Sequence, residues 1–585
     1  MTDLRFLPIS LALATAVIAG CGSGTSPSSG GGAPPPPAGT TISGTVMNGS
    51  TPLLSATVQL YAVGTAGLQS ASTALLSTPA VTSSTGAFSL TFTCGTATEV
   101  YLSASGGNSG AGTNSASNLL SAIGPCSGIT SSSAFTVNEA TTVAAVFALT
   151  PFLADSAHLG ASGSNPAGLT NAFAMIGSLV NVASGSVPGP ALASGATAPA
   201  ATLDTLANIL AGCIHSGSAS APACATLLTA TSASDTLGAA LHIARQPASN
   251  LGLYSLASAY APFTPALNAA PADWTLSLRV AASGLSAPYG VAIDASGNAW
   301  ISNEGATTLS KLSPTGTLLS TVSAVGLLGP RGLSIDRTGN VWVASTGNDS
   351  VVELTSGGSV KAALTTGVPA PLSIANDSAG DAWVASSTNN TVVEISTAGA
   401  AINTVSGLNA PSAVAVDASG NVWVANPGAN NLVELSHSGA ATATTSDGVT
   451  QAPAYVAIDA GGNVWFTGSV PSASSVRGSV AEIAASGAAA TPVLNASTLP
   501  RGIATSGSSV WIANGTASGG LMEFQAGGST PVSPANGFGA LNAPVGVAVD
   551  PSGNVWTANS GENSVSIFLG LAVPVTTPLA ANAGP

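Results

Sequence analysis

The sequence predicts a multidomain, mainly β protein, in which a seven-bladed β-propeller follows a small β-sandwich and an Ala-rich helical domain. A motif of the type Pro-x-Gly-Val-Ala-Ile-Asp-x-x-Gly-Asn-x-Trp recurs seven times between Pro288 and Trp556. The tryptophans of the motif are spaced 42, 41, 40, 42, 46 and 45 residues apart, with alternating strand-like segments between them. A period near 40 residues is typical of propeller blades of about four strands each.

Composition narrows the class of protein. The chain has 585 residues, of which 45% are hydrophobic and 5% are charged. Beyond residue 20, no uninterrupted apolar run reaches the roughly 18 residues that span a bilayer. The net charge of -14 and the absence of Lys and Arg clusters argue against binding of nucleic acid or anionic membranes.

Residues 1–21 have the form of an export signal. Arg5 precedes a mainly apolar stretch that ends in Ile18-Ala19-Gly20-Cys21. These residues resemble the lipobox of bacterial lipoproteins, which implies a signal peptide, acylation of Cys21, and a membrane anchor at the cell envelope. In such lipoproteins an Asp after the cysteine suggests retention at the inner membrane. Because Gly22 follows Cys21 here, the same resemblance favours a location at the outer membrane or cell surface. An ordinary signal peptide with a chance cysteine is the alternative. Residues 22–40, rich in Gly, Ser and Pro, predict a tether.

Four cysteines remain after Cys21: Cys94, Cys126, Cys213 and Cys224. An even number in an exported chain suggests two disulfide bonds. Three pairings are possible, and proximity in sequence favours Cys94–Cys126 and Cys213–Cys224. Their spacings match neither a metal site nor a redox Cys-x-x-Cys motif.

Two domains are expected before the propeller. In residues 41–137, Thr41–Val46, Ala56–Tyr61 and Gly86–Phe92 alternate with the period of half-buried strands. This segment resembles the carboxypeptidase regulatory-like, prealbumin-type module. Residues 138–270 predict a helical domain, with Asn138 as a helix start. The segments with helical spacing are Glu139–Leu149, Leu169–Val182, Ala201–Ala211 and Ala225–Arg245.

The propeller is expected over residues 271–570, followed by a tail over 571–585. In each repeat, Asp-x-x-Gly-Asn predicts a turn, and the tryptophan is expected to pack between blades. Of the 23 acidic residues, 11 recur at repeat positions, which indicates a structural role. Trp274–Pro288 matches the fourth-strand segment of a later repeat. This segment is expected to complete the last blade, which predicts seven blades.

The repeat resembles NHL-type propellers and, within them, the virginiamycin B lyase-like branch. Members of that branch are lyases that use a metal ion with histidine and acidic residues, so the resemblance implies such a site on the propeller face. The position after the repeat proline carries no histidine here, and His437 is the single histidine of the repeats. This departure argues against lyase activity. The sequence therefore predicts no catalytic residue, no metal ligand and no cofactor.

A ligand site is expected where non-recurring side chains meet at one face. The loops that enter the first strands carry Tyr289, Arg331, Tyr455 and Arg501, and an insertion over 468–478 carries Arg477. Guanidinium groups pair with carboxylate or phosphate through two parallel hydrogen bonds. These five residues are the predicted ligand-binding residues. The alternative is that the arginines are exposed rim residues paired with acids.

Three functions follow from these observations. The favoured hypothesis is a lipid-anchored envelope protein whose propeller is a binding or interaction scaffold for a protein, a glycan or a small anionic ligand. The alternatives are a metal-dependent lyase or lactonase-like enzyme and a purely structural envelope component. Expected partners are the membrane, through Cys21, and an envelope protein or glycan, with no nucleic acid.

Overall fold

The computed structural model describes residues 39–576, apart from 365–366, 447, 449, 472–475, 488–498 and 529. At 471, 476 and 477 the description covers the backbone only. The predicted signal peptide, the lipidation site Cys21 and residues 22–38 of the predicted tether lie outside the described residues. None of the helices in the described part of the chain is long and apolar enough to cross a bilayer.

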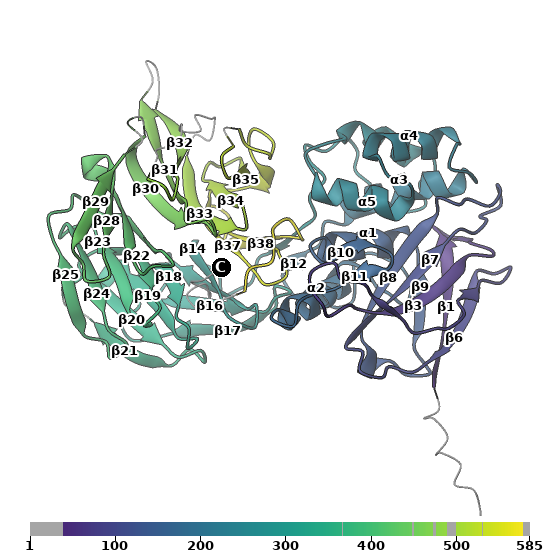
Figure 1. Cartoon of the computed structure of the whole chain (residues 1–585), viewed down its shortest axis with the longest axis horizontal. Helices are drawn as coiled ribbons and strands as arrows, with labels where there is room; N and C mark the ends of the chain where they lie inside the picture. The colour runs from purple at the N-terminus through teal and green to yellow at the C-terminus, as the bar shows by residue number, and fades with distance from the viewer. Residues whose placement is uncertain are drawn as a thin grey trace, which may run out of the picture. The chain divides into compact units, whose positions relative to one another are not determined.

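Two sheets occupy the N-terminal part (Figure 1). Strands such as Ala87–Phe92 alternate buried and exposed residues because one face of the sheet is buried, whereas Glu99–Ser105 and Asn118–Pro125 are buried on both faces. The disulfide bond Cys94–Cys126 confirms the predicted pairing. The strands are β1 (Thr40–Asn48), β2 (Thr51–Pro52), β6 (Ala87–Phe92) and β9 (Ala134–Val137) in one sheet, and β3 (Thr57–Ala62), β4 (Thr73–Ala74), β5 (Ala80–Val81), β7 (Glu99–Ser105) and β8 (Asn118–Pro125) in the other.

Five α-helices follow within the described residues. They are α1 (Glu139–Leu149), α2 (Pro166–Leu179), α3 (Ala200–His215), α4 (Pro222–Thr231) and α5 (Thr236–Arg245), with the short hairpin β10 (Leu153–Asp155) and β11 (His158–Leu159) after α1. Asn138 caps α1 as predicted, since its side chain accepts a hydrogen bond from the Thr141 N–H at 2.9 Å. The disulfide bond Cys213–Cys224 joins α3 to α4, as predicted.

One predicted helical segment differs from the structure. Ala225–Arg245 is two helices, because Ser232 adopts a left-handed conformation with φ 52° and ends α4. Asp235 then starts α5 by accepting a hydrogen bond from the Gly238 N–H at 2.8 Å. An aspartate side chain satisfies a free N–H of a first helical turn in this way.

The tryptophan repeats form seven antiparallel sheets within the described residues, here numbered repeat sheets 1 to 7 in chain order (Figure 1). β13 pairs with β39, as predicted for the strand that precedes the first repeat, and β12 adds a further strand that the sequence did not predict. The strands of repeat sheets 1 to 4 are, for sheet 1, β14 (Pro288–Ile293), β15 (Ala299–Asn303), β16 (Thr308–Leu312) and β17 (Leu318–Ser323); for sheet 2, β18 (Pro330–Ile335), β19 (Val341–Ser345), β20 (Ser350–Leu354) and β21 (Val360–Leu364); for sheet 3, β22 (Pro371–Asn376), β23 (Ala382–Ser386), β24 (Thr391–Ile395) and β25 (Ala401–Val405); and for sheet 4, β26 (Ala413–Val416), β27 (Val422–Asn426), β28 (Asn431–Leu435) and β29 (Ala441–Thr445). The strands of repeat sheets 5 to 7 are, for sheet 5, β30 (Gln451–Ile458), β31 (Val464–Pro471) and β32 (Val476–Ile483); for sheet 6, β33 (Pro500–Ser506), β34 (Ser509–Asn514), β35 (Gly519–Gln525) and β36 (Phe538–Leu541); and for sheet 7, β37 (Pro544–Val549), β38 (Val555–Asn559), β39 (Ser564–Phe568), β13 (Ser277–Val280) and β12 (Ala196–Thr197).

The recurring residues hold the sheets together. Six of the seven repeat tryptophans are at most 1% exposed, and Trp423 is half-buried. Four of them donate their indole N–H to the turn aspartate of their own repeat, as Trp556 does to Asp550 at 2.9 Å. The recurring indoles and turn carboxylates are therefore structural, as the sequence predicts.

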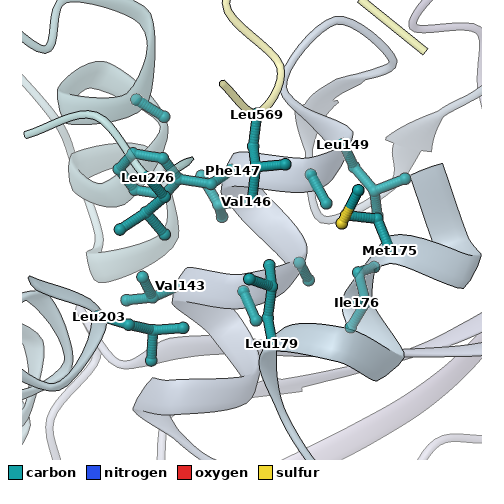
Figure 2. Close-up of a cluster of buried hydrophobic side chains, with 14 of the residues drawn as sticks. Val143, Val146, Phe147, Leu149, Met175, Ile176, Leu179, Leu203, Leu276 and Leu569 are labelled. Carbon is teal, nitrogen blue, oxygen red and sulfur yellow. The ribbon is translucent and has the colours of Figure 1, made fainter. Parts of the chain in front are cut away.

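The helices and repeat sheet 7 share one hydrophobic core. Figure 2 shows Leu276, just before β13, and Leu569, just after β39, beside Phe147 of α1. Polar contacts continue this packing: Asn165 donates to the Pro551 carbonyl at 2.8 Å, and Ser552 donates to the Gly168 carbonyl at 2.8 Å. The sheets of the repeats and the helices before them are therefore packed together rather than joined by a linker alone.

Candidate functional site at the starts of the first strands

A cavity of about 270 Å³ lies where the first strands of the seven repeat sheets begin. Glycines of the Pro-x-Gly motif allow these strands to approach one another. A Cβ at Gly546 would lie 2.3 Å from the Tyr289 carbonyl oxygen of sheet 1, and one at Gly290 would lie 2.4 Å from the Arg331 carbonyl oxygen of sheet 2. Only a residue without a Cβ fits such an approach.

Two tyrosines from sheets far apart in the sequence meet at this cavity. Tyr289 follows the repeat proline of sheet 1, and Tyr455 of sheet 5 stands where four of the other repeats have glycine. Their hydroxyl oxygens are 2.9 Å apart, and both residues line the cavity. Burial raises the pKa of Tyr455 far above its ordinary value, and the neighbouring Tyr289 raises it further. The Tyr455 hydroxyl therefore stays neutral and can both donate and accept a hydrogen bond.

Arg331 is held on the ring of Tyr289. Its guanidinium carbon lies 5.3 Å from the ring centroid, within the range of a cation–π contact. Its Nε donates to Glu304 Oε1 at 2.7 Å, so a carboxylate already balances its charge. Arg331 is therefore paired with an acid, as in the predicted alternative, and it also lines the cavity.

Arg501 differs from Arg331 in its partner. Its side chain packs on Gly515, where an added Cβ would lie 2.7 Å from Arg501 Cγ, and it hydrogen bonds the Tyr455 hydroxyl. Among the residues that the structure describes, no Asp or Glu lies within ion-pair distance of Arg501. No carboxylate of the described residues therefore offsets its positive charge at the rim of the cavity.

The structure thus brings four of the five predicted ligand residues together. Tyr289, Arg331 and Tyr455 line the cavity, and Arg501 joins them through Tyr455. The insertion in sheet 5 lengthens β31 and β32, in which Arg477 pairs with Val470. The side chain of Arg477 lies outside the described residues, so its predicted role stays a prediction.

Several polar residues of the same face are structural. Four residues after the second strands accept a hydrogen bond from the N–H of a left-handed alanine that enters the next sheet, at 2.7 to 2.9 Å. The acceptor and donor pairs are Asp349 and Ala370, Asn390 and Ala410, Asn430 and Ala452, and Asn563 and Ala287. These side chains link neighbouring sheets and are therefore engaged in packing. We call these four contacts the inter-sheet clasps.

A second cluster lies at the opposite ends of the first strands. Asp377, Glu394 and His437 each offer one potential metal-ligand atom, and these atoms lie within 4.8 Å of one another. The sequence predicts no metal ligand here, because Asp377 and Glu394 are among the recurring acidic residues that it indicates to be structural. The available signal was that the single histidine of the repeats follows a third strand, but nothing in the sequence places it beside sheet 3.

The sheets define this part of the chain as a β-propeller. Residues 276–567 match the model of the virginiamycin B lyase family, and this part of the chain is a virginiamycin B lyase-like propeller. The match does not extend to the N-terminal sheets, whose predicted prealbumin-type resemblance stays a prediction. No curated protein matches the sequence.

The solved structures that are similar to the chain include two lyases and one synthase. A streptogramin B lyase is 16% identical, with a TM-score of 0.42, over 49% of this chain and 94% of its own. A catalytically inactive virginiamycin B lyase from Staphylococcus aureus with quinupristin is 17% identical, with a TM-score of 0.44, over 50% and 98%. Kuenenia stuttgartiensis hydrazine synthase is 17% identical, with a TM-score of 0.43, over 48% and 95%.

Proposed function

We propose that the protein is a binding protein whose propeller takes a small anionic ligand in the cavity between the first strands. The single observation that carries this proposal is the arrangement of Arg501, which reaches the Tyr455 hydroxyl and has no acidic partner among the described residues. A ligand carboxylate would accept hydrogen bonds from this guanidinium and from a tyrosine hydroxyl. Such charge-assisted bonds are shorter and stronger than neutral ones.

A closed ring of seven blades would place the cavity on its axis. Neighbouring first strands contact one another in order from β14 to β37, and β37 also contacts β14. Gly546 of β37 lies against Tyr289 of β14, which supports closure between the last and first sheets. In such a ring the Tyr289–Tyr455 pair spans the mouth of the central channel.

The size and the lining of the cavity favour binding over catalysis. A volume of about 270 Å³ suits a monosaccharide acid or a small aromatic acid rather than a drug-sized ligand. The lining residues that the structure describes include tyrosine and arginine but no histidine, aspartate or glutamate. A lyase or lactonase needs a group that exchanges a proton near its working pH, and histidine and the carboxylates are the usual choices.

The anchor at the cell envelope is the second part of the proposal. The lipobox-like residues Ile18-Ala19-Gly20-Cys21 support acylation of Cys21, which would hold the propeller at a membrane surface. Cys21→Ser should move the protein from the membrane fraction to the soluble fraction of fractionated cells. Retention of this variant in the membrane fraction would contradict lipid anchoring through Cys21.

Titration calorimetry tests the ligand class. The probes are benzoate, succinate and glucuronate, each with a neutral counterpart: benzamide, succinamide and glucose. We expect at least one acid to bind and its neutral counterpart to bind more weakly. Arg501→Ala should lower the affinity for that acid by about tenfold or more. Arg337→Ala is the matched control, since Arg337 is exposed in the turn after β18, away from the cavity. Equal binding of acids and counterparts would contradict an anion site.

A further inference from the structure

The turn of repeat sheet 3 departs from the other turns of its kind. In five repeats, an asparagine donates its side-chain amide to Oδ2 of the turn aspartate at 2.9 to 3.0 Å. In sheet 3 this position holds Asp381, whose carboxylate accepts from the Thr397 N–H at 2.9 Å. A carboxylate cannot replace the amide donor. Asp377 Oδ2 therefore still accepts a hydrogen bond from the Trp383 indole N–H at 3.3 Å, but it has no asparagine amide as a second donor. In place of that amide it has the carboxylate of Asp381, which carries the same charge.

Glu394 brings a third carboxylate to the same place. It stands opposite Trp383 in the register of β23 and β24 and is 6% exposed. Burial, and then the nearby Asp377, raise the pKa of its carboxyl above the ordinary value.

Lysines balance this charge in two other sheets. In sheet 2 the equivalent Glu353 has Lys361 Nζ at 2.6 Å, and in sheet 1 Lys311 itself replaces the glutamate and lies 3.0 Å from Asp294. In sheet 3 the described part of the chain brings no Lys or Arg within ion-pair distance of Asp377, Asp381 or Glu394.

His437 enters this cluster from repeat sheet 4. It lies in the turn between β28 and β29, with Nδ1 3.7 Å from Asp377 Oδ2 and with 62% of its side chain exposed. Asn403 of sheet 3 holds the turn in place by donating to the Ser438 carbonyl at 3.0 Å. An imidazole is thus positioned across the boundary of two sheets, next to a surplus of carboxylates.

We propose that Asp377, Glu394 and His437 bind a divalent transition-metal ion such as Zn²⁺, which joins repeat sheets 3 and 4. One imidazole nitrogen and two carboxylate oxygens form a donor set that suits this ion, with water as the fourth ligand. Ligand atoms about 2.1 Å from a tetrahedral ion lie about 3.4 Å apart, so a modest rotation of the exposed imidazole closes the site. The Trp383 indole orients the Asp377 carboxylate from the second layer of contacts.

This site is independent of the proposed ligand cavity. Asp377 follows the last residue of β22, whereas the cavity residues of that sheet begin at Leu372, near the start of the strand. The ion would therefore stabilise the boundary of two sheets rather than contact the ligand.

Zinc titration of the untagged full-length chain, after removal of metal with a chelator, tests the site. We expect one Zn²⁺ per chain and a higher thermal midpoint with the ion bound. His437→Ala and Glu394→Gln should each weaken binding at least about tenfold, since even residues that only orient ligands contribute this much. The matched controls are His158→Ala, which removes an exposed histidine beside Asp155, and Glu434→Gln, which changes the equivalent glutamate of sheet 4.

The variant Asp381→Asn distinguishes a metal site from a cluster of side chains that only supports the fold. The restored amide would donate to Asp377 and remove one negative charge, so this variant should be more stable without metal and should bind Zn²⁺ more weakly. Absence of stoichiometric binding, or unchanged affinity in His437→Ala, would overturn the proposal. Because His437 is exposed, its variant remains informative if Glu394→Gln fails to fold.

Discussion

At the scale of the residue, a chain of contacts crosses the ligand cavity. It runs from Glu304 through Arg331 to the ring of Tyr289, across the hydroxyl pair to Tyr455, and on to Arg501. Tyrosine hydroxyls both donate and accept hydrogen bonds, so the pair in the middle can rearrange around a new acceptor. A bound carboxylate would displace or extend this middle part of the chain of contacts.

Tyr455→Phe tests the middle of the chain. The change removes the hydroxyl that Tyr289 and Arg501 share, so we expect a loss of about 1 kcal/mol in the free energy of unfolding and weaker binding of the acid probe. Urea unfolding and titration calorimetry measure the two effects. Tyr254→Phe is the control, because its hydroxyl donates to the Leu267 carbonyl at 3.0 Å away from the cavity and should affect stability alone. Unchanged binding by Tyr455→Phe would exclude the hydroxyl from the site.

Site residues were predictable only where they break the repeat. Tyr289, Arg331, Tyr455 and Arg501 stand out because their positions otherwise vary or carry glycine. Their contacts were not predictable, since they depend on sheets 1, 2, 5 and 6 meeting at one place. The cluster of Asp377, Glu394 and His437 was missed for the same reason. The sequence shows that Asp381 breaks the Asp-x-x-Gly-Asn pattern of this turn, but His437 belongs to a different repeat.

At the scale of the element, the inter-sheet clasps are short and local. Each places an Asp or Asn in a left-handed conformation after a second strand, where its side chain accepts from the alanine that enters the next sheet. These residue types tolerate that conformation better than most. The clasps thus use one residue both to end a loop and to fix the distance between two sheets.

Asn390→Ala should destabilise the propeller by about 1 kcal/mol or more. The change removes the acceptor for the Ala410 N–H at 2.7 Å and leaves alanine in a left-handed conformation. Asn390→Asp should be tolerated, because Asp349 serves in the same way in sheet 2. The exposed neighbour Asn389 supplies the control Asn389→Ala, which should leave the thermal midpoint unchanged. Equal midpoints for Asn389→Ala and Asn390→Ala would refute the clasp.

Elements were predictable where their pattern is local. The helix predicted after Asn138 is observed as α1 over the predicted residues, and the three strands predicted from periodicity in the N-terminal part are observed as β1, β3 and β6. The break between α4 and α5 was missed, although residues 232–235 (Ser-Ala-Ser-Asp) carry no large apolar side chain and end in a residue that favours a helix start. The two-residue strand β12 could not be predicted, since it exists only through its pairing with β13.

At the scale of the whole molecule, buried carboxylates couple stability to pH. Burial raises the pKa of Glu139 to about 8 and that of Asp204 to about 7. Between pH 4.5 and 8 the unfolded chain releases the Glu139 proton while the folded chain retains it, so a rise in pH favours unfolding. The stability that protonated Glu139 contributes is fully present below the pKa of this group in the unfolded chain. It is lost as the pH rises through the pKa of this group in the folded chain.

Chemical unfolding at pH 5 and pH 8 measures this coupling. We expect a lower free energy of unfolding at pH 8, and Glu139→Gln should reduce the difference because its side chain stays neutral. Glu562→Gln is the control. Because the pKa of Glu562 is lowered, this residue changes stability at a lower pH than the range measured here. An unchanged pH dependence in Glu139→Gln would exclude Glu139 as its source.

The shared core predicts that helices and propeller unfold together. Phe147 is 1% exposed and belongs to the same core as Leu276 and Leu569 (Figure 2). Phe147→Ala should cost about 3 to 5 kcal/mol and lower one common transition, seen both by helix circular dichroism and by tryptophan fluorescence. Separate transitions for the two signals would show that the helices and the repeat sheets are independent.

A crystal structure with the best-bound acid of the probe panel would show whether the cavity is the anion site. We expect electron density for the acid in the cavity, with its carboxylate within hydrogen-bond distance of the Arg501 guanidinium and the Tyr455 hydroxyl. Density for the acid at any other surface, with the Tyr289–Tyr455 pair undisturbed, would contradict it.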